Sequence, residues 1–366
     1  MKKTFFVLTL LPALLVGGVS CSKLRDLPLP DTSGPMARLE VSVSSVCGTR
    51  ATTPSEGDEA GVSRIEVLVF NTAGGLDAYK SADGSSLTVS DIVTSAGEKT
   101  IVAVVNSPDG SGVGDVRSLS ALRALSSAFL ADNDPDSFVM YGEKSAVLGT
   151  SLTNSVNIEV GRLASRIRID KLVRNFDSSL SGLVAMDAGG FEITRFFLVN
   201  VPSACNYGAF VATAGVGGWI NGEGPLTAVP PASVAISKDP LVYSAAVTAA
   251  GANCLAQGAA YENVHRLYSY PNPSGSAFRT KLVVEVVIDS QTYSFPLEFE
   301  ELKPNYSYEI RSLTITRLGN PSDGDDNLDP DEPLEPVETL SMEAVISVSP
   351  WTLVLMGENG DGIISI

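Results

Sequence analysis

The chain has 366 residues, enough for two domains of ordinary size, and a formal net charge of −17 from 25 Lys and Arg against 42 Asp and Glu. This charge argues against nucleic acid and bare anionic lipid as partners, because both attract cationic proteins. One histidine and four cysteines leave little scope for metal or catalytic chemistry. Val, Ser, Thr, Gly and Ile are abundant and suit strands and tight turns, so the composition predicts a mostly β protein.

The first residues have the features of a secretory signal that ends at a lipidated cysteine. A basic start precedes an uncharged, mostly apolar run over residues 4–19, which is too short to span a membrane. Cys21 follows small residues, as at a bacterial lipoprotein cleavage site, although Gly18 stands where Leu is usual. We expect residues 1–20 to be removed and Cys21 to carry long acyl chains such as palmitate, which would anchor the protein to a membrane. An ordinary cleaved signal is the alternative.

One strand is predicted directly after a proline-rich tether. Leu39, Val41 and Val43 alternate with polar residues, which indicates a strand with a single buried face. Residues 48–63 are small, polar and rich in turn formers, and Arg50 lies among them. A strand is therefore followed by a hinge that a protease could cut.

A first domain is predicted over residues 51–160. Apolar runs predict strands over residues 65–70, 100–105, 138–142 and 156–160. The run at 100–105 is continuous, which is typical of a strand covered on both faces. Residues 117–131 place Leu and Phe side chains on one helical face, and either Ser118 or Ser120 is a suitable N-cap.

A second domain is predicted over residues 161–318. Its strands are expected to begin at Ile167 and to cover residues 191–199, 282–288, 293–297 and 306–315. Asp289-Ser290-Gln291 is expected to form a hairpin turn between two of them. Residues 201–240 lack firm periodicity and are expected to be loop with short strands.

The C-terminal part separates into a linker and a strand. Residues 319–338 contain eight Asp or Glu, four Pro and no Lys or Arg, so an extended solvated linker is favoured over a Ca²⁺ site. Within residues 339–366, apolar side chains alternate and change phase at Pro350; they are Leu340, Met342, Ala344, Ile346, Val348, Trp351 and Leu353. Such a strand either folds back onto its own domain or adds to the sheet of a neighbouring molecule.

Short β signatures in a fixed order give the chain a family resemblance. They are Thr49-Arg50-Ala51, residues 63–71, 99–106, 162–169 and 197–202, and the closing Val348-Ser349-Pro350-Trp351. Together with the lipoprotein signal, they resemble the fimbrillins, the type V pilins of Gram-negative anaerobes. The resemblance implies two β-sandwich-like, transthyretin-like domains with one or two short helices and a C-terminal donor strand.

The resemblance also implies a mode of assembly. The subunit would reach the outer membrane as a lipoprotein, and an arginine-specific surface protease would cut between Arg50 and Ala51. Residues 21–50, with the strand that holds Leu39, Val41 and Val43, would then leave. The vacated groove would accept the donor strand of another subunit, which builds a surface fimbria from copies of the chain and accessory subunits. Arg38 and Arg64 are rival cut sites: the first precedes the strand and the second begins one.

The remaining candidates for chemistry are few. Cys205 and Cys254 either form a disulfide or stay as unpaired thiols. His265 is expected to be a surface or packing residue, and the chain carries no motif of a known enzyme class, so we expect no catalytic residue, cofactor or metal. Alternatives to a stalk subunit are a fimbrial anchor, a tip or accessory subunit, and a surface lipoprotein that binds glycans through Trp219, Trp351, Tyr261, Tyr268 and Tyr270.

Overall fold

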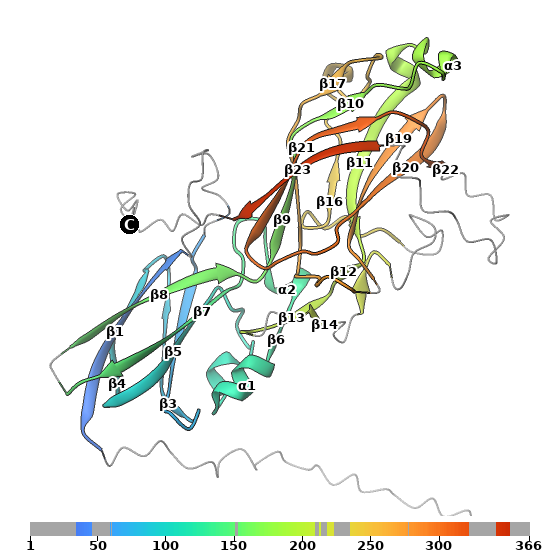
Figure 1. The fold of residues 1–366 in the computed structure, drawn as a ribbon. Helices are drawn as coiled ribbons and strands as arrows, with labels where there is room; N and C mark the ends of the chain where they lie inside the picture. The colour runs from blue at the N-terminus through green and yellow to red at the C-terminus, as the bar shows by residue number, and fades with distance from the viewer. Residues whose placement is uncertain are drawn as a thin grey trace, which may run out of the picture.

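The fold is taken from a computed structural model, which describes residues 34–45, 59, 61–150, 153–208, 212–213, 218–222, 235–276, 278–321 and 342–351. The chain forms two elongated lobes placed end to end (Figure 1). Strands dominate both, and the described α-helices are short: α1 (Leu119–Ala124), α2 (Phe129–Asp132) and α3 (Ser181–Val184). The mostly β fold class predicted from composition and pattern is confirmed.

The N-terminal lobe is a seven-stranded sheet that folds over itself. Its strands are β1 (Met36–Ser45), β2 (Arg64–Phe70), β3 (Leu76–Asp83), β4 (Thr88–Ser95), β5 (Gly97–Val105), β7 (Met140–Leu148) and β8 (Asn154–Arg162). Their order is β3-β2-β5-β7-β8-β1-β4. Apolar side chains of β1 and β4 pack against those of β2 and β5 in one buried cluster, so the two ends of the sheet face each other as a sandwich.

The central strands of this lobe are buried on both faces. In β2, Ile65 and Val67 belong to the cluster inside the sandwich, whereas Leu68 and Phe70 belong to a second cluster on the outer face. The second cluster includes residues of α1 and α2 and continues into the C-terminal lobe. Residues 101–105 of β5 are buried without exception, which confirms that this continuous apolar run is covered on both sides.

The single helix predicted over residues 117–131 is wrong. Ser118 does cap α1, because its side chain accepts a hydrogen bond from the Ala121 amide at 3.1 Å. The chain then leaves the helix as β6 (Ser126–Ala128), which pairs with β13 (Ala204–Asn206), and only then forms α2. A partner almost eighty residues away thus overrides the local helical periodicity.

The C-terminal lobe contains two main sheets. Its strands are β9 (Ser165–Ile169), β10 (Leu172–Arg174), β11 (Phe191–Val199), β16 (Tyr243–Ala245), β17 (Ala260–Tyr261), β18 (His265–Ser269), β19 (Lys281–Ile288), β20 (Gln291–Glu298), β21 (Tyr306–Ile315), β22 (Asn320–Pro321) and β23 (Met342–Pro350). One sheet has the order β17-β10-β21-β9-β18, with β23 added on β21, and the other has the order β16-β11-β19-β20-β22.

Short strands complete the described part of the chain. They are β12 (Val201–Pro202) with β15 (Trp219–Ile220), and β14 (Ala212–Thr213) beside β13. The predicted hairpin between β19 and β20 is confirmed, and Asp289 and Ser290 both have positive φ, 48° and 69°, as a type I′ turn requires. Since β13 also pairs with β6, this small sheet joins the two lobes.

Candidate functional site

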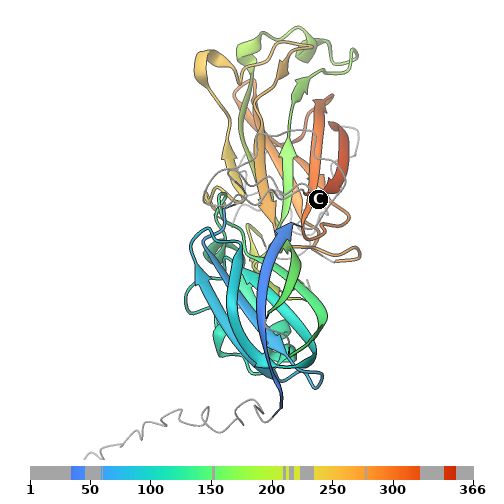
Figure 2. The same cartoon turned by 90° about the vertical axis from the view of Figure 1, so that its left-hand side faces the viewer.

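The first strand, β1, lies between two neighbours. From Leu39 to Ser45 it pairs in parallel with β8, and from Met36 to Ser42 it pairs antiparallel with β4. Figure 2 shows β1 in blue along the length of the lower lobe, beside the green β8. The predicted inward residues Leu39, Val41 and Val43 are each 1% exposed. Each such side chain contributes about 1.5–3 kcal/mol on burial, so β1 is integral to the lobe.

Polar contacts from β8 add to this hold on β1. The Ser42 hydroxyl donates to Asn157 Oδ1 at 3.1 Å, and Asn157 Nδ2 donates to the Ser44 hydroxyl at 2.8 Å. Asn154 Nδ2 donates to the Arg38 carbonyl at 2.9 Å. Removal of β1 would therefore leave a groove between β4 and β8 that has lost partners along both walls.

Several predicted site residues fall outside the described part of the chain. They are Cys21, Arg50, Ala51, Leu340 and Leu353. Both rival cut sites are described. Arg38 lies within β1 with its side chain 68% exposed, so the prediction that it precedes the strand is wrong. Arg64 begins β2 as predicted and pairs with Glu66 at 3.4 Å.

The C-terminal strand, β23, lies against its own lobe. It pairs antiparallel with β21, from Tyr306 opposite Pro350 to Ile315 opposite Met342, and β9 and β10 occupy the other side of β21. Ala344, Ile346 and Val348 of the predicted donor strand lie in this strand, in the fold-back arrangement. Figure 1 shows β23 in red, running towards the junction between the lobes. Among the described strands, β21 is the only neighbour of β23, whereas β1 has two neighbours.

Trp351 fixes the end of β23 at the junction. Its side chain is 1% exposed, and the guanidinium carbon of Arg162 lies 4.0 Å from its ring centre, a cation–π distance. The Tyr268 ring stacks on it at 5.7 Å and the Phe138 ring meets it edge-on at 5.3 Å. Its amide donates to the Asn305 carbonyl at 2.7 Å. Both lobes thus contribute to the pocket around Trp351.

Glu59 is a functional candidate that the sequence reasoning missed. Its carboxylate accepts hydrogen bonds from Arg166 Nη1 at 2.7 Å, from Trp351 Nε1 at 3.1 Å and from the Tyr268 hydroxyl at 2.6 Å. Its carbonyl accepts from Arg162 Nη2 at 2.9 Å. Burial, and then the charge of Glu59, raise the pKa of Tyr268 far above its usual value. One carboxylate therefore joins the segment after Arg50 to the end of β23.

Of the two alternatives for Cys205 and Cys254, a disulfide or unpaired thiols, the structure has the unpaired thiols. The backbone of Cys254 pairs with that of Glu192, at the start of β11, in an isolated β-bridge. Cys205 lies in β13, which follows the other end of β11 in the chain. Nine residues of strand span roughly 30 Å, while a disulfide needs Cα atoms within about 7 Å. Burial raises the pKa of the Cys205 thiol to about 12, so the thiol is unreactive.

His265 and four of the five aromatic residues considered for glycan binding are packed inside the protein, whereas Trp219 is half-buried and meets the Phe278 ring edge-on at 5.5 Å. His265 is 4% exposed; its Nδ1 is 2.8 Å from the Ser244 hydroxyl and its Nε2 is 2.8 Å from the Tyr261 hydroxyl. Burial lowers the pKa of His265 to about 4, so the ring is neutral at pH 7. Tyr261, Tyr268, Tyr270 and Trp351 are at most 3% exposed, so they form no open platform for a sugar ring.

The described residues contain neither a cluster suited to a metal ion nor a membrane-spanning helix. Among them, no three His, Cys, Asp or Glu side chains gather in a way that would hold a metal ion. No helix in the same residues has the length and apolar character needed to cross a membrane.

Comparison with known proteins identifies solved structures that share this fold. No family model and no curated protein matches the chain. Among solved structures, a candidate cell adhesion protein from Bacteroides eggerthii has a TM-score of 0.62 at 16% identity, over 87% of this chain and 97% of that one. The fimbrilin FimA from Porphyromonas gingivalis has a TM-score of 0.58 at 13% identity, over 87% and 98%.

A tip protein shares the fold more loosely. The tip fimbrial protein Mfa3 from Porphyromonas gingivalis, with C-terminal truncation, has a TM-score of 0.50 at 10% identity and covers 87% of this chain and 100% of its own. At these identities the likeness establishes the fold. The chain has the fold of the fimbrilins, as the resemblance in its sequence implied.

Proposed function

We propose that the chain is a structural subunit of a cell-surface fimbria and a member of the fimbrillin family. The shared fold with a fimbrilin over most of both chains supports this role. The buried histidine and the packed aromatic residues also favour a structural role over an enzymatic or glycan-binding one. The precursor would be an outer-membrane lipoprotein anchored through Cys21.

The subunit would polymerise by donor-strand exchange after cleavage between Arg50 and Ala51. The observation that carries this proposal is the position of β1, which forms ladders with both β4 and β8. It connects to the rest of the lobe only through the segment that contains Arg50. A cut there would make β1, the strand between β8 and β4, a separate peptide that can be replaced.

The driving force for strand exchange comes from the number of neighbouring strands with which β23 can form hydrogen bonds. In its own lobe β23 has one described neighbour, β21, whereas a strand in the groove of β1 would have two. Main-chain hydrogen bonds to both walls, and apolar side chains in the sites of Leu39, Val41 and Val43, would favour transfer into a second copy of the chain. While β1 is attached, it blocks this transfer.

The test is cleavage of the full-length protein by an arginine-specific protease, followed by N-terminal sequencing and electron microscopy. We expect a new N-terminus at Ala51 and fibres that resist denaturant. Arg50→Ala should abolish both, while the matched control Arg38→Ala should leave both intact. Monomers after a complete cut at Ala51 would contradict the proposal.

A tip or accessory subunit is the second candidate, and the likeness to a tip fimbrial protein favours it. A tip subunit needs no donor strand at its exposed end. A chain truncated after residue 341 separates the two roles: a stalk subunit should no longer extend fibres, whereas a tip subunit should still join them. An anchor would keep its lipid and remain uncut at Arg50.

A further inference from the structure

Strand β4 depends on β1 for its backbone pairing. In the described part of the chain, β1 is the only strand in a ladder with β4, from Met36 opposite Ser95 to Ser42 opposite Thr88. Two flanking bonds, from the Val43 amide to the Leu87 carbonyl and from the Ala96 amide to the Pro35 carbonyl, also end on the segment of β1. If β1 leaves, as the proposed function requires, β4 loses its whole ladder.

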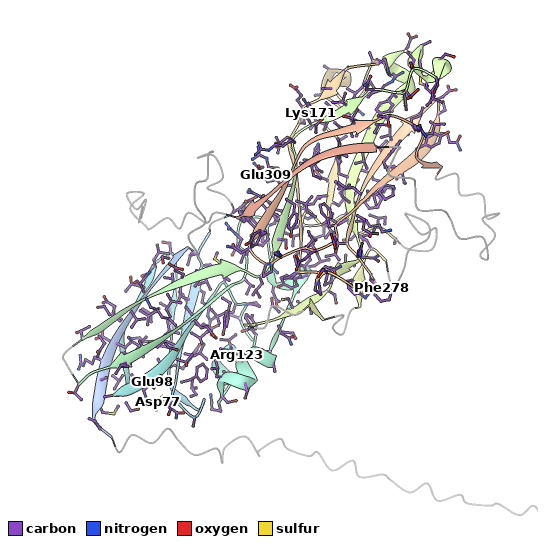
Figure 3. The ribbon with its side chains drawn as sticks, viewed as in Figure 1. Asp77, Glu98, Arg123, Lys171, Phe278 and Glu309 are labelled. Atoms are coloured by element: carbon purple, nitrogen blue, oxygen red, sulfur yellow. The ribbon has the colours of Figure 1, made fainter. Side chains whose placement is uncertain are left out.

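A buried carboxylate on β3 holds β4 by a different route. Asp77 Oδ2 accepts hydrogen bonds from Thr94 Oγ1 at 2.9 Å, from Ser95 Oγ at 2.6 Å and from the Ser95 amide at 3.2 Å. Lys99 Nζ lies 2.7 Å from the same oxygen and also donates to Ser95 Oγ at 2.7 Å. Figure 3 labels Asp77 in the N-terminal lobe. None of these bonds involves β1.

The geometry of this cluster suits a permanent attachment. The side chains of Asp77 and Lys99 are each 4% exposed, so water does not compete for their bonds. Farther along β4, Lys80 of β3 donates to the Ser90 carbonyl at 2.8 Å. Residues of β3 therefore hold β4 near its middle and at its end through side chains, although no ladder joins the two strands.

We propose that Asp77, through Thr94, Ser95 and Lys99, keeps β4 in place after β1 has left, and so preserves a groove that fits a strand from a second copy of this chain. The inference rests on the proposed function, in which β1 departs. Asp77 is then a positioning residue of the acceptor groove, because it contacts the wall of the groove rather than the incoming strand.

The test uses a full-length chain with an inserted protease site within residues 46–58, so that the cut does not depend on Arg50. The freed N-terminal peptide is removed in mild urea. The variant Thr94→Val with Ser95→Ala removes bonds between Asp77 and β4 but retains the Asp77–Lys99 ion pair. Thr194→Val is the matched control, because Thr194 Oγ1 donates to the Glu285 carboxylate at 2.9 Å in the C-terminal lobe.

Two readouts are compared, hydrogen exchange of the β4 amides and capture of a synthetic peptide of residues 340–355. Before the cut, all chains should exchange alike, because β1 holds β4. After the cut, β4 in the variant should exchange about thirtyfold faster than in the parent and the control, since the side-chain hydrogen bonds of Thr94 and Ser95 to Asp77, about 1 kcal/mol each, are lost. Capture should slow by about the same factor.

The outcomes separate this inference from the proposed function. Equal exchange and equal capture in the cut parent and the cut variant would overturn the inference. Unprotected β4 amides in the cut parent would overturn it as well. Faster exchange in the variant, with no peptide capture by any chain, would uphold the role of Asp77 and contradict strand exchange. Asp77→Asn is a second variant that should give the same faster exchange.

Discussion

The strands β1 and β23 lie near opposite ends of the chain and are held in different ways. Ladders on both sides hold β1, and its apolar side chains face the interior of the sandwich. One ladder to β21 holds β23, together with the buried Trp351 just beyond its end. A strand with two ladders is part of its lobe, whereas a strand with one ladder and one anchored side chain can leave a lobe that stays folded.

The largest expected effect comes from deletion of either strand. A chain without residues 1–45 should unfold its N-terminal lobe at a much lower temperature, because the apolar residues of the sandwich lose the strand that covers them, although Asp77 keeps β4 attached. A chain that ends at residue 341 should keep two cooperative transitions, with the C-terminal one at a lower temperature. Differential scanning calorimetry measures both, and equal effects of the two deletions would break the comparison.

The next largest effect concerns Trp351. Trp351→Ala should lower the free energy of unfolding of the C-terminal lobe by about 3–5 kcal/mol, since it empties a pocket between Arg162 and Tyr268. Hydrogen exchange should accelerate in β21 and β23 and stay unchanged in β1. Trp351→Phe is the control, because it keeps an aromatic ring and loses the bond to Glu59. Acceleration in β1 as well would show that the two strands are not held independently.

Acid should affect the two lobes over different pH ranges. The pKa of His265 falls from 6.5 to about 4 on folding, so the unfolded chain binds a proton more readily, and stability declines as the pH drops from 6.5 to 4. The shift corresponds to about 3 kcal/mol. Urea unfolding at several pH values measures this decline, which His265→Gln should remove. No pH dependence in the parent chain over that range would contradict it.

In the N-terminal lobe the titrating group is Asp77. Burial alone would raise the pKa of its carboxyl, but hydrogen bonds from Lys99, Ser95 and Thr94 outweigh burial and hold the pKa below its usual 3.8. Its contribution is therefore complete above pH 3.8 and is lost as the pH falls through the lower, folded-state value. Hydrogen exchange in β4 should stay constant from pH 6.5 to 4, after correction for the intrinsic rate, and exchange near His265 should not.

The smallest effect is expected at a surface ion pair that supports neither strand. Arg279 and Glu298 are 2.9 Å apart and each is 40% exposed. Glu298→Gln should change stability by about 0–1 kcal/mol, because water and salt screen exposed pairs. Calorimetry of the Glu298→Gln and Trp351→Ala chains under the same conditions measures the two stability changes. A loss as large as that of Trp351→Ala would mean that surface charge governs the stability of this lobe.

The sequence predicts the strands of both lobes better than the contacts between them. Alternating or continuous apolar runs identified β1, β2, β5, β11 and β21, because each carries its own burial pattern. The strand β3 was missed because its residues are mostly half-buried and show no alternation. Residues 126–128 left the predicted helix for a partner that local periodicity does not reveal.

Among the site residues, the sequence predicted those that lie in a stretch of alternating apolar and polar residues. Leu39, Val41 and Val43 were predicted from their alternation and are buried. Glu59 lies in a polar stretch that resembles a hinge, and only its distant partners Arg166, Tyr268 and Trp351 make it a candidate. The role of Asp77 likewise depends on side chains from two other strands.

Strand β21 pairs with β23 on one side and with β9 and β10 on the other, and this arrangement bears on whether fibres would associate with one another. A subunit that donates β23 would expose unpaired amides and carbonyls along one edge of the ten-residue strand β21, a template on which strands of other fibres can add. Glu309 and Arg311, 2.5 Å apart, place charges on this strand (Figure 3 labels Glu309), and charged side chains are a common protection against such addition. Whether fibres stay single or gather into bundles would then depend on two side chains that take no part in joining subunit to subunit.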